Sequence, residues 1–94
     1  MAVSKSIEER EGLVFRALAD TTRRKLLDIL KQNPGLTVAE LEPHFSMSRF
    51  NVMKHLNVLE EAGLLERERE GSSRKIFLKS DPIKLAHQRC KDWL

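Results

Sequence analysis

The sequence is poor in cysteine and has no long apolar run, and these two absences exclude several classes of protein. With Cys90 as its one cysteine, the chain has neither an internal disulfide framework nor a zinc ribbon built from CxxC pairs. Its apolar runs are only a few residues long, whereas a membrane-spanning helix needs roughly 18. The start, MAVSKSIEEREG, lacks the apolar segment of a secretory signal, so we expect a cytoplasmic protein that does not bind a membrane.

The sequence also lacks the motifs on which most enzymes depend. It has no Gly-rich phosphate loop, no paired carboxylates and no Ser/His/Asp set. A chain of 94 residues also leaves little room for a substrate pocket of ~300 Å³ or more. We therefore predict that the protein is not an enzyme and holds no cofactor.

Basic residues are present in modest excess, and their distribution is informative. Seventeen Lys and Arg residues against fourteen Asp and Glu residues give a net charge of +3. The acids crowd into 60–70, whereas several basic residues stand in segments without acidic neighbours: Arg49, Lys54, Arg74, Lys75 and Lys79. A basic surface made of two separate segments favours a polyanionic partner.

Helical periodicity and capping residues predict a mainly α-helical chain with one small β-hairpin. Asp20 or Thr21 is expected to cap the second helix, and Thr37 with Glu40 forms a capping box before the third. Asp81-Pro82 predicts the N-cap and first residue of the last helix. The expected order is ααααββα within one domain over 1–94, with helices at 7–19, 22–32, 38–45, 49–62 and 82–94 and strands at 64–70 and 74–79.

A short helix, a tight turn and a longer helix form a helix-turn-helix unit over 37–62, and the hairpin at 64–79 is its wing. The apolar positions Val52, Leu56 and Leu59 assign one side of the longer helix to the core. The opposite side of 48–62 is therefore expected to face outward.

That outward side carries the residue types that bind duplex DNA, and it presents Arg49, Phe50, Asn51, Lys54 and His55. Arginine and asparagine make paired hydrogen bonds to guanine and adenine edges, while lysine and histidine suit phosphate oxygens. Ser48 stands where the helix N-terminus favours an anion. Two plainer interpretations stay open, namely that the charged face is only solvated and that Phe50 packs beneath the first helix of the unit.

Three stretches resemble the ArsR family of bacterial winged-helix repressors: FRALADTTRR (15–24), LTVAEL (36–41) and SRFNVMKHLNVLEEAGLL (48–65). The resemblance covers roughly residues 12–83. It implies a winged helix that binds an operator near its own promoter and represses it. The positions that match DNA-facing residues of the family are Ser48, Arg49, Asn51, Lys54 and His55, and Arg74 and Lys75 match its wing at 71–75.

The first and last helices are expected to form a homodimer, as the resemblance also implies. The last helix carries an apolar seam that is too large for one small chain to hide, and a two-fold dimer requires an inverted-repeat operator. The residues assigned to this interface are Ile7, Val14, Ile83, Ala86, Cys90 and Trp93.

One departure from the family concerns metal sensing. The founding members carry a Cys-x-Cys pair on the third helix, and Val38–His44 has no cysteine, so no metal site is predicted. Two other functions stay open: a winged helix used only for protein interaction or dimerisation, and a metal or redox sensor built on His87 and Cys90. The sequence names no inducer.

Overall fold

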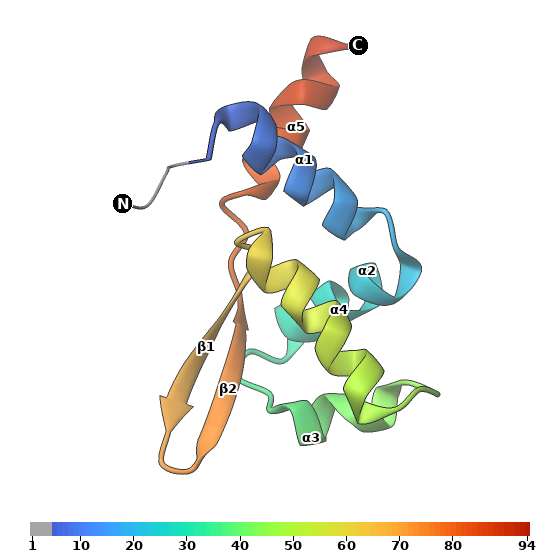
Figure 1. Cartoon of the computed structure of the whole chain (residues 1–94), viewed down its shortest axis with the longest axis vertical. Coiled ribbons are helices and arrows are strands. Elements are labelled where there is room, and N and C mark those ends of the chain that lie inside the picture. Colours follow the sequence, from blue (N-terminus) through green and yellow to red (C-terminus); the bar gives the residue numbers. More distant parts are fainter. Residues whose placement is uncertain (1–4) are drawn as a thin grey trace.

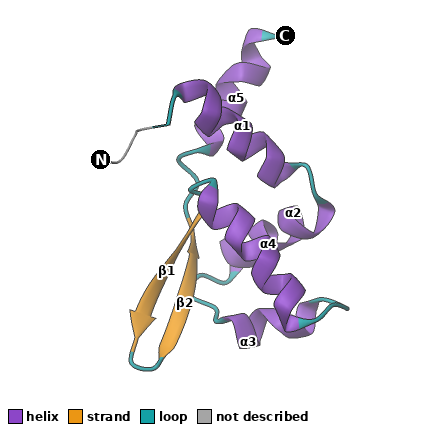
Figure 2. Cartoon of the chain, viewed as in Figure 1, coloured by secondary structure: helices purple, strands orange, loops and turns teal. Residues whose placement is uncertain are grey.

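The computed structural model describes residues 5–94 and has the predicted order of elements. The helices and the hairpin follow one another as ααααββα, with one extra 3₁₀ turn (Figure 2). The elements are α1 (Ile7–Leu18), α2 (Thr21–Gln32), α3 (Val38–Leu41), the 3₁₀ turn η1 (Glu42–His44), α4 (Arg49–Glu61), β1 (Leu65–Glu70), β2 (Ser73–Leu78) and α5 (Ile83–Asp92). The mainly α fold with a small β-hairpin is confirmed.

The molecule has two distinct ends (Figure 1). Helices α1 and α5 lie together at one end, and the tip of the hairpin and α3 lie at the other. Helix α4 runs between them, so its N-terminus stands at the hairpin end and its C-terminus near α1 and α5. This arrangement separates the first turn of α4 from the packed pair α1–α5.

The core forms where α2, α4 and the hairpin meet. Leu26 and Leu30 of α2 and Val52, Leu56 and Leu59 of α4 are all fully buried. Their spacing of three and four residues places them on one stripe of each helix, as the sequence predicts for α4. Burial of this stripe fixes which side of α4 faces outward.

Helix α4 ends in a Schellman motif. Gly63 has a φ of 77°, and its N–H donates to the Glu60 carbonyl at 2.9 Å. The next N–H, of Leu64, donates to the Leu59 carbonyl at 2.9 Å. A glycine adopts this left-handed conformation without a Cβ penalty, so the chain reverses directly from α4 into β1.

The third helix is shorter than predicted because of Pro43. The predicted span of 38–45 ends as an α-helix at Leu41 and continues as η1. Proline has no N–H to donate to the carbonyl four residues earlier, so the α-helical pattern stops there. The Phe45 N–H instead bonds to the Glu42 carbonyl at 3.1 Å, which is a 3₁₀ bond.

The hairpin has a tighter turn than predicted. Glu70 pairs with Ser73, so only Gly71 and Ser72 form the loop, and the strands begin and end about one residue from the predicted positions. Gly71 has a φ of 62°, which suits the first position of a two-residue hairpin loop. Leu36 adds an isolated bridge to Ile76, which ties the entrance of α3 to β2.

The start of α5 also differs from the prediction. Asp81 does not cap the helix with its side chain, and its carboxylate lies 3.6 Å from the Lys84 ammonium. The backbone carbonyls of Ser80 and Asp81 accept the N–H groups of Ile83 and Lys84, so residues 80–82 form a turn and α5 begins at Ile83. No helix among residues 5–94 combines the length and apolar content needed to span a membrane.

Asp20 is the N-cap of α2, one of the two residues that the sequence proposes. Its Oδ2 accepts the Arg23 N–H at 3.1 Å. This backbone hydrogen bond is the main cause that holds the pKa of Asp20 below its ordinary value, and the charge of the Arg23 guanidinium adds to it. Because the pKa is lowered on folding, the carboxylate stabilises the fold above its ordinary pKa and ceases to do so as the pH falls through the folded value.

We expect Asp20→Ala to lower the free energy of unfolding by about 1 kcal/mol at pH 7, since an N-cap is lost. Asp20→Asn is the matched control, because asparagine caps a helix as well as aspartate does but carries no charge. The difference between Asp20 and Asp20→Asn should shrink as the pH falls through the lowered pKa of Asp20 and vanish once the parent carboxylate is protonated. Urea unfolding from pH 2 to 7 measures both, and a difference that grows in acid would contradict the assignment.

Candidate nucleic-acid interface

The first turn of α4 presents exposed polar side chains around a capped N-terminus. Ser48 is the N-cap, and its Oγ accepts the Asn51 N–H at 3.2 Å. Arg49, Asn51 and Lys54 are exposed, and the first turn of α4 contains no acidic residue. Free N–H groups and unopposed cations make this end of α4 attractive to an anion.

Phe50 lies on the surface, which answers the alternative that it packs under a helix. Its side chain is 70% exposed, and the Lys54 ammonium lies 5.6 Å from the centre of its ring. This cation–π contact keeps the lysine stem on the aromatic face. Phe50 and Lys54 thus form one exposed pair beside Arg49.

A groove of about 420 Å³ lies between α3, the outer side of α4 and the hairpin. Arg49 comes from α4 and Arg74 from β2, so the groove brings together the two basic segments that the sequence separates. The residues that line it are Thr37, Val38, Ala39, Arg49, Met53, Arg67, Ser72, Ser73, Arg74 and Ile76. Its positive side chains suit a polyanion rather than a neutral ligand.

The two predicted wing residues are not equivalent. Successive side chains of a strand point to opposite faces, so Arg74 shares the face of buried Ile76, while Lys75 points the other way. Lys75 lies 3.6 Å from the Glu70 carboxylate, whereas Arg74 forms no ion pair within residues 5–94. The structure therefore brings Arg74, but not Lys75, into the groove with Arg49.

Arg67 also lines the groove, although it belongs to the acid-rich segment 60–70 and not to the two basic segments. Its Nη2 donates to the Asn57 Oδ1 at 2.8 Å, and its Nε lies 3.5 Å from the Glu60 carboxylate. These contacts fasten the wing to α4. Strand alternation was the available signal, because Arg67 follows buried Leu65 by two residues and pairs with buried Ile76.

His55 lies partly under the surface of α4, unlike the exposed residues of the first turn. Its side chain is 24% exposed, and its Nδ1 lies 3.2 Å from an Arg23 guanidinium nitrogen and 3.8 Å from the Asp20 carboxylate. Two elements distant in the sequence, the start of α2 and the middle of α4, thus meet at this histidine. Helical periodicity gives no sign of this contact, because Arg23 and His55 stand 32 residues apart in the sequence.

At the other end, α1 and α5 pack against each other within one chain. The rings of Phe15 and Trp93 stack with their centres 6.3 Å apart, and the Arg89 guanidinium lies 3.0 Å from the Glu11 carboxylate. Val14 and Ala86, both predicted at a dimer interface, are buried in this packing. They are therefore closed to a second chain.

The remaining predicted interface residues differ in exposure. Ile83 packs partly buried against the core. Ile7 is 57% and Trp93 70% exposed, and Cys90 is also exposed. The apolar surface open to a partner at this end is therefore made by Ile7, Trp93 and the terminal Leu94.

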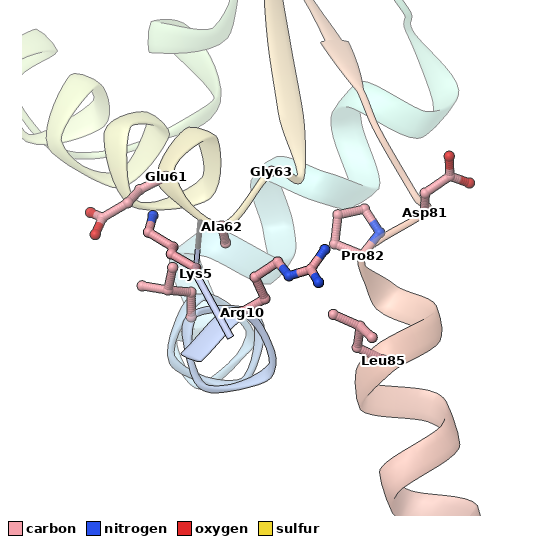
Figure 3. Close-up of a pocket in the computed structure, with 9 residues that line it drawn as sticks. Lys5, Arg10, Glu61, Ala62, Gly63, Asp81, Pro82 and Leu85 are labelled. Carbon is pink, nitrogen blue, oxygen red and sulfur yellow. The ribbon is translucent and has the colours of Figure 1, made fainter. Parts of the chain in front are cut away.

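A second hollow, of about 430 Å³, lies beside the α4–β1 turn (Figure 3) and shares no lining residue with the groove. The start of α1, Gly63 and the start of α5 surround it, and Arg10 extends across it toward Pro82. Its residues are Lys5, Arg10, Leu13, Glu61, Ala62, Gly63, Asp81, Pro82 and Leu85. This set offers no serine, cysteine or histidine for nucleophilic catalysis.

The metal or redox alternative rests on His87 and Cys90, which are both exposed on α5. Among the described residues, no group of three or more His, Cys, Asp or Glu side chains is placed to hold a metal ion. A closed zinc site needs four ligands. The predicted absence of a metal site stays a prediction.

Comparison with known proteins gives consistent matches. A family model described as a helix-turn-helix domain matches residues 18–68. The uncharacterised HTH-type transcriptional regulator YuzN of Bacillus subtilis is 39% identical over 77 residues, which span 76% of this chain and 84% of that protein. The transcriptional repressor SdpR of the same organism is 40% identical over 58 residues, which span 62% of this chain and 63% of that protein.

A solved structure agrees with the sequence matches over nearly the whole length. The crystal structure of an ArsR family transcriptional regulator superposes with a TM-score of 0.83 at 31% identity, covering 99% of this chain and 92% of that one. The exposed first turn of α4, the wing beside it and the packed α1–α5 end are thus parts of a known architecture. The chain belongs to the ArsR family of winged helix-turn-helix proteins and is a DNA-binding transcriptional regulator, not an enzyme.

Proposed function

We propose that the protein is a homodimeric repressor that reads an inverted-repeat operator with α4 and holds the flanking backbone with the wing. The observation that carries this proposal is the groove in which Arg49 of α4 and Arg74 of β2 face the same space. Both cations stand at the end of α4 that has no acidic residue in its first turn. A helix of this kind fits the major groove of duplex DNA.

Within this proposal the exposed residues have separate roles. Arg49 and Asn51 read base edges, because arginine and asparagine pair with guanine and adenine in the major groove. Lys54 and Arg74 bind phosphates, together with the Ser48 hydroxyl and the N–H groups behind it. Phe50 contacts the DNA with its exposed ring, and His55 reaches a phosphate from the second turn. Lys75 binds a phosphate only when its ion pair with Glu70 breaks.

The dimer part of the proposal rests on the α1–α5 end. Exposed apolar side chains concentrate there, with Ile7, Trp93 and Leu94, while the α4 N-terminus lies at the opposite end. A two-fold axis at this end presents two α4 helices about one DNA turn apart, ~34 Å, to successive major grooves. Cys90 is exposed on α5, three residues before the C-cap Trp93.

Repression is favoured over activation because the relative SdpR is named a transcriptional repressor. A regulator of this kind acts where the chromosome lies, so we place it in the cytoplasm of a bacterial cell. A dimer that covers an operator blocks polymerase without any catalytic step.

The decisive experiment is selection of bound duplexes from a random DNA library, followed by affinity measurements at several salt concentrations. We expect an inverted repeat to emerge, and affinity to fall with log–log slope of about −0.9 for each phosphate neutralised. The alternative of a protein-interaction module predicts no enrichment and no duplex binding at ~0.1 M salt. A palindromic consensus bound at one dimer per site supports the proposal, and a single half-site contradicts the dimer.

The dimer is tested separately by sedimentation equilibrium of the parent and of Trp93→Ala. We expect a dimer at micromolar concentration and at least about tenfold weaker association in the variant, because an aromatic anchor in an interface is worth about 2 kcal/mol or more. Glu61→Ala, which changes an exposed residue near α4's end, is the control. A parent that stays monomeric would reject the dimer.

A further inference from the structure

Arg23 connects three elements through its side chain and its backbone. Its Nε donates to the Ala17 carbonyl at 2.9 Å, and its Nη2 donates to the Arg16 carbonyl at 2.8 Å. Both carbonyls belong to the last turn of α1, and the Arg16 carbonyl also accepts the Ala19 N–H at 3.3 Å. The remaining nitrogen, Nη1, lies 3.2 Å from Nδ1 of His55 on α4. One guanidinium therefore spans from α1 to α4.

The contact with His55 fixes which ring nitrogen carries a proton. A guanidinium has donors and no acceptor, so the hydrogen bond requires Nδ1 of His55 to accept. The imidazole proton then sits on Nε2. Within residues 5–94, Nε2 has no hydrogen-bond partner and is not fully buried. The free N–H donor of His55 is thus available to an outside acceptor.

We propose that Arg23 is a positioning residue that fastens the DNA-reading helix α4 to the end of α1 and holds His55 with its Nε2–H donor ready for a DNA phosphate. This inference rests on the proposed function, because it assumes that α4 enters DNA. Helix α1 belongs to the end at which the dimer is proposed, and α4 carries Arg49 and Asn51. Arg23 therefore links the end proposed for dimerisation to the reading helix through hydrogen bonds of one side chain.

Arg24 provides a matched control at the same helix end. Its Nη1 donates to the Leu18 carbonyl at 2.7 Å, and its Nη2 lies 3.4 Å from the Thr21 hydroxyl. It thus has the same charge as Arg23 and also bonds to a carbonyl at the end of α1. Among the described residues its side chain makes no hydrogen bond or ion pair with α4. Loss of Arg24 removes one bond to α1 but leaves the link to α4 intact.

The test compares Arg23→Gln, Arg24→Gln, His55→Phe and the double variant Arg23→Gln/His55→Phe. We expect Arg23→Gln to weaken binding to the selected duplex by about tenfold, as loss of a charged hydrogen bond predicts, and Arg24→Gln to change it less than about threefold. The affinity of the double variant should lie within about twofold of that of Arg23→Gln. Both substitutions break the same Arg23–His55 hydrogen bond, so their effects should not add. Additive losses, or equal losses for the two arginines, would overturn the proposal.

A second measurement does not depend on DNA. Nitrogen-15 NMR of the free parent protein should show neutral His55 with its proton on Nε2, and Arg23→Gln should abolish this preference while Arg24→Gln retains it. Observation of a proton on Nδ1 in the parent overturns the link even if Arg23→Gln fails to fold. A parent that shows the predicted tautomer but binds no duplex rejects the proposed function and leaves the Arg23–His55 link intact.

Discussion

Arg49→Ala is expected to lower affinity for the best operator by about 5- to 150-fold, which corresponds to a loss of ~1–3 kcal/mol from one paired base contact. The variant should lose base discrimination at one base pair of each half-site and keep it at the other positions. At that position the variant should accept all four bases almost equally, because the side chain that distinguishes them is gone. The reason is structural: Arg49 is exposed in the first turn of α4 and points into the groove beside the wing.

Lys54→Ala is the matched control for Arg49→Ala, since it removes a cation from the next turn of the same exposed side. A phosphate contact carries no sequence information, so this variant should weaken specific and non-specific duplexes alike and lower the salt slope by about one. Competition with every single-base variant of the operator separates the two patterns. An unchanged base preference in Arg49→Ala would show that Arg49 does not read the sequence.

Leu56→Ala is expected to reduce the free energy of unfolding by about 2–5 kcal/mol. Leu56 is fully buried where α4 packs on α2, so truncation loses buried area and leaves a cavity. A small domain has only ~5–15 kcal/mol of stability, so this is a large share of it. Since α4 is also the proposed reading helix, DNA affinity should fall with the folded fraction as temperature rises.

The control for Leu56→Ala is Glu61→Ala, an exposed substitution on the same helix that should stay within about 0.5 kcal/mol of the parent. Urea unfolding with a common m-value measures both variants. A loss below about 1 kcal/mol in Leu56→Ala would mean that α4 does not depend on this contact and that the assignment of its inner face is wrong.

The elements and the inner face of α4 followed from the sequence because they depend on local chemistry. The stripe of Val52, Leu56 and Leu59 repeats at helical spacing, and the capping box of Thr37 and Glu40 forms within one turn. Gly63 terminates α4 for an equally local reason, the positive φ. The expected bounds were wrong at α3 and α5. Pro43 changes α3 into a 3₁₀ turn, and residues 80–82 form a backbone turn in place of a side-chain cap at Asp81.

The tertiary structure decided which side chains are free and which are engaged. Arg74 and Lys75 are adjacent in the sequence, but the direction of β2 places only Arg74 in the groove. Val14 and Trp93 both fit an apolar seam, yet the packing of α1 on α5 buries Val14 and leaves Trp93 mostly exposed. His55 fits the outward side of α4 by periodicity, but contact with Arg23 depends on two helices meeting 32 residues apart. Helical spacing specifies only a direction around one helix, whereas the partner found in that direction is set by how the helices pack.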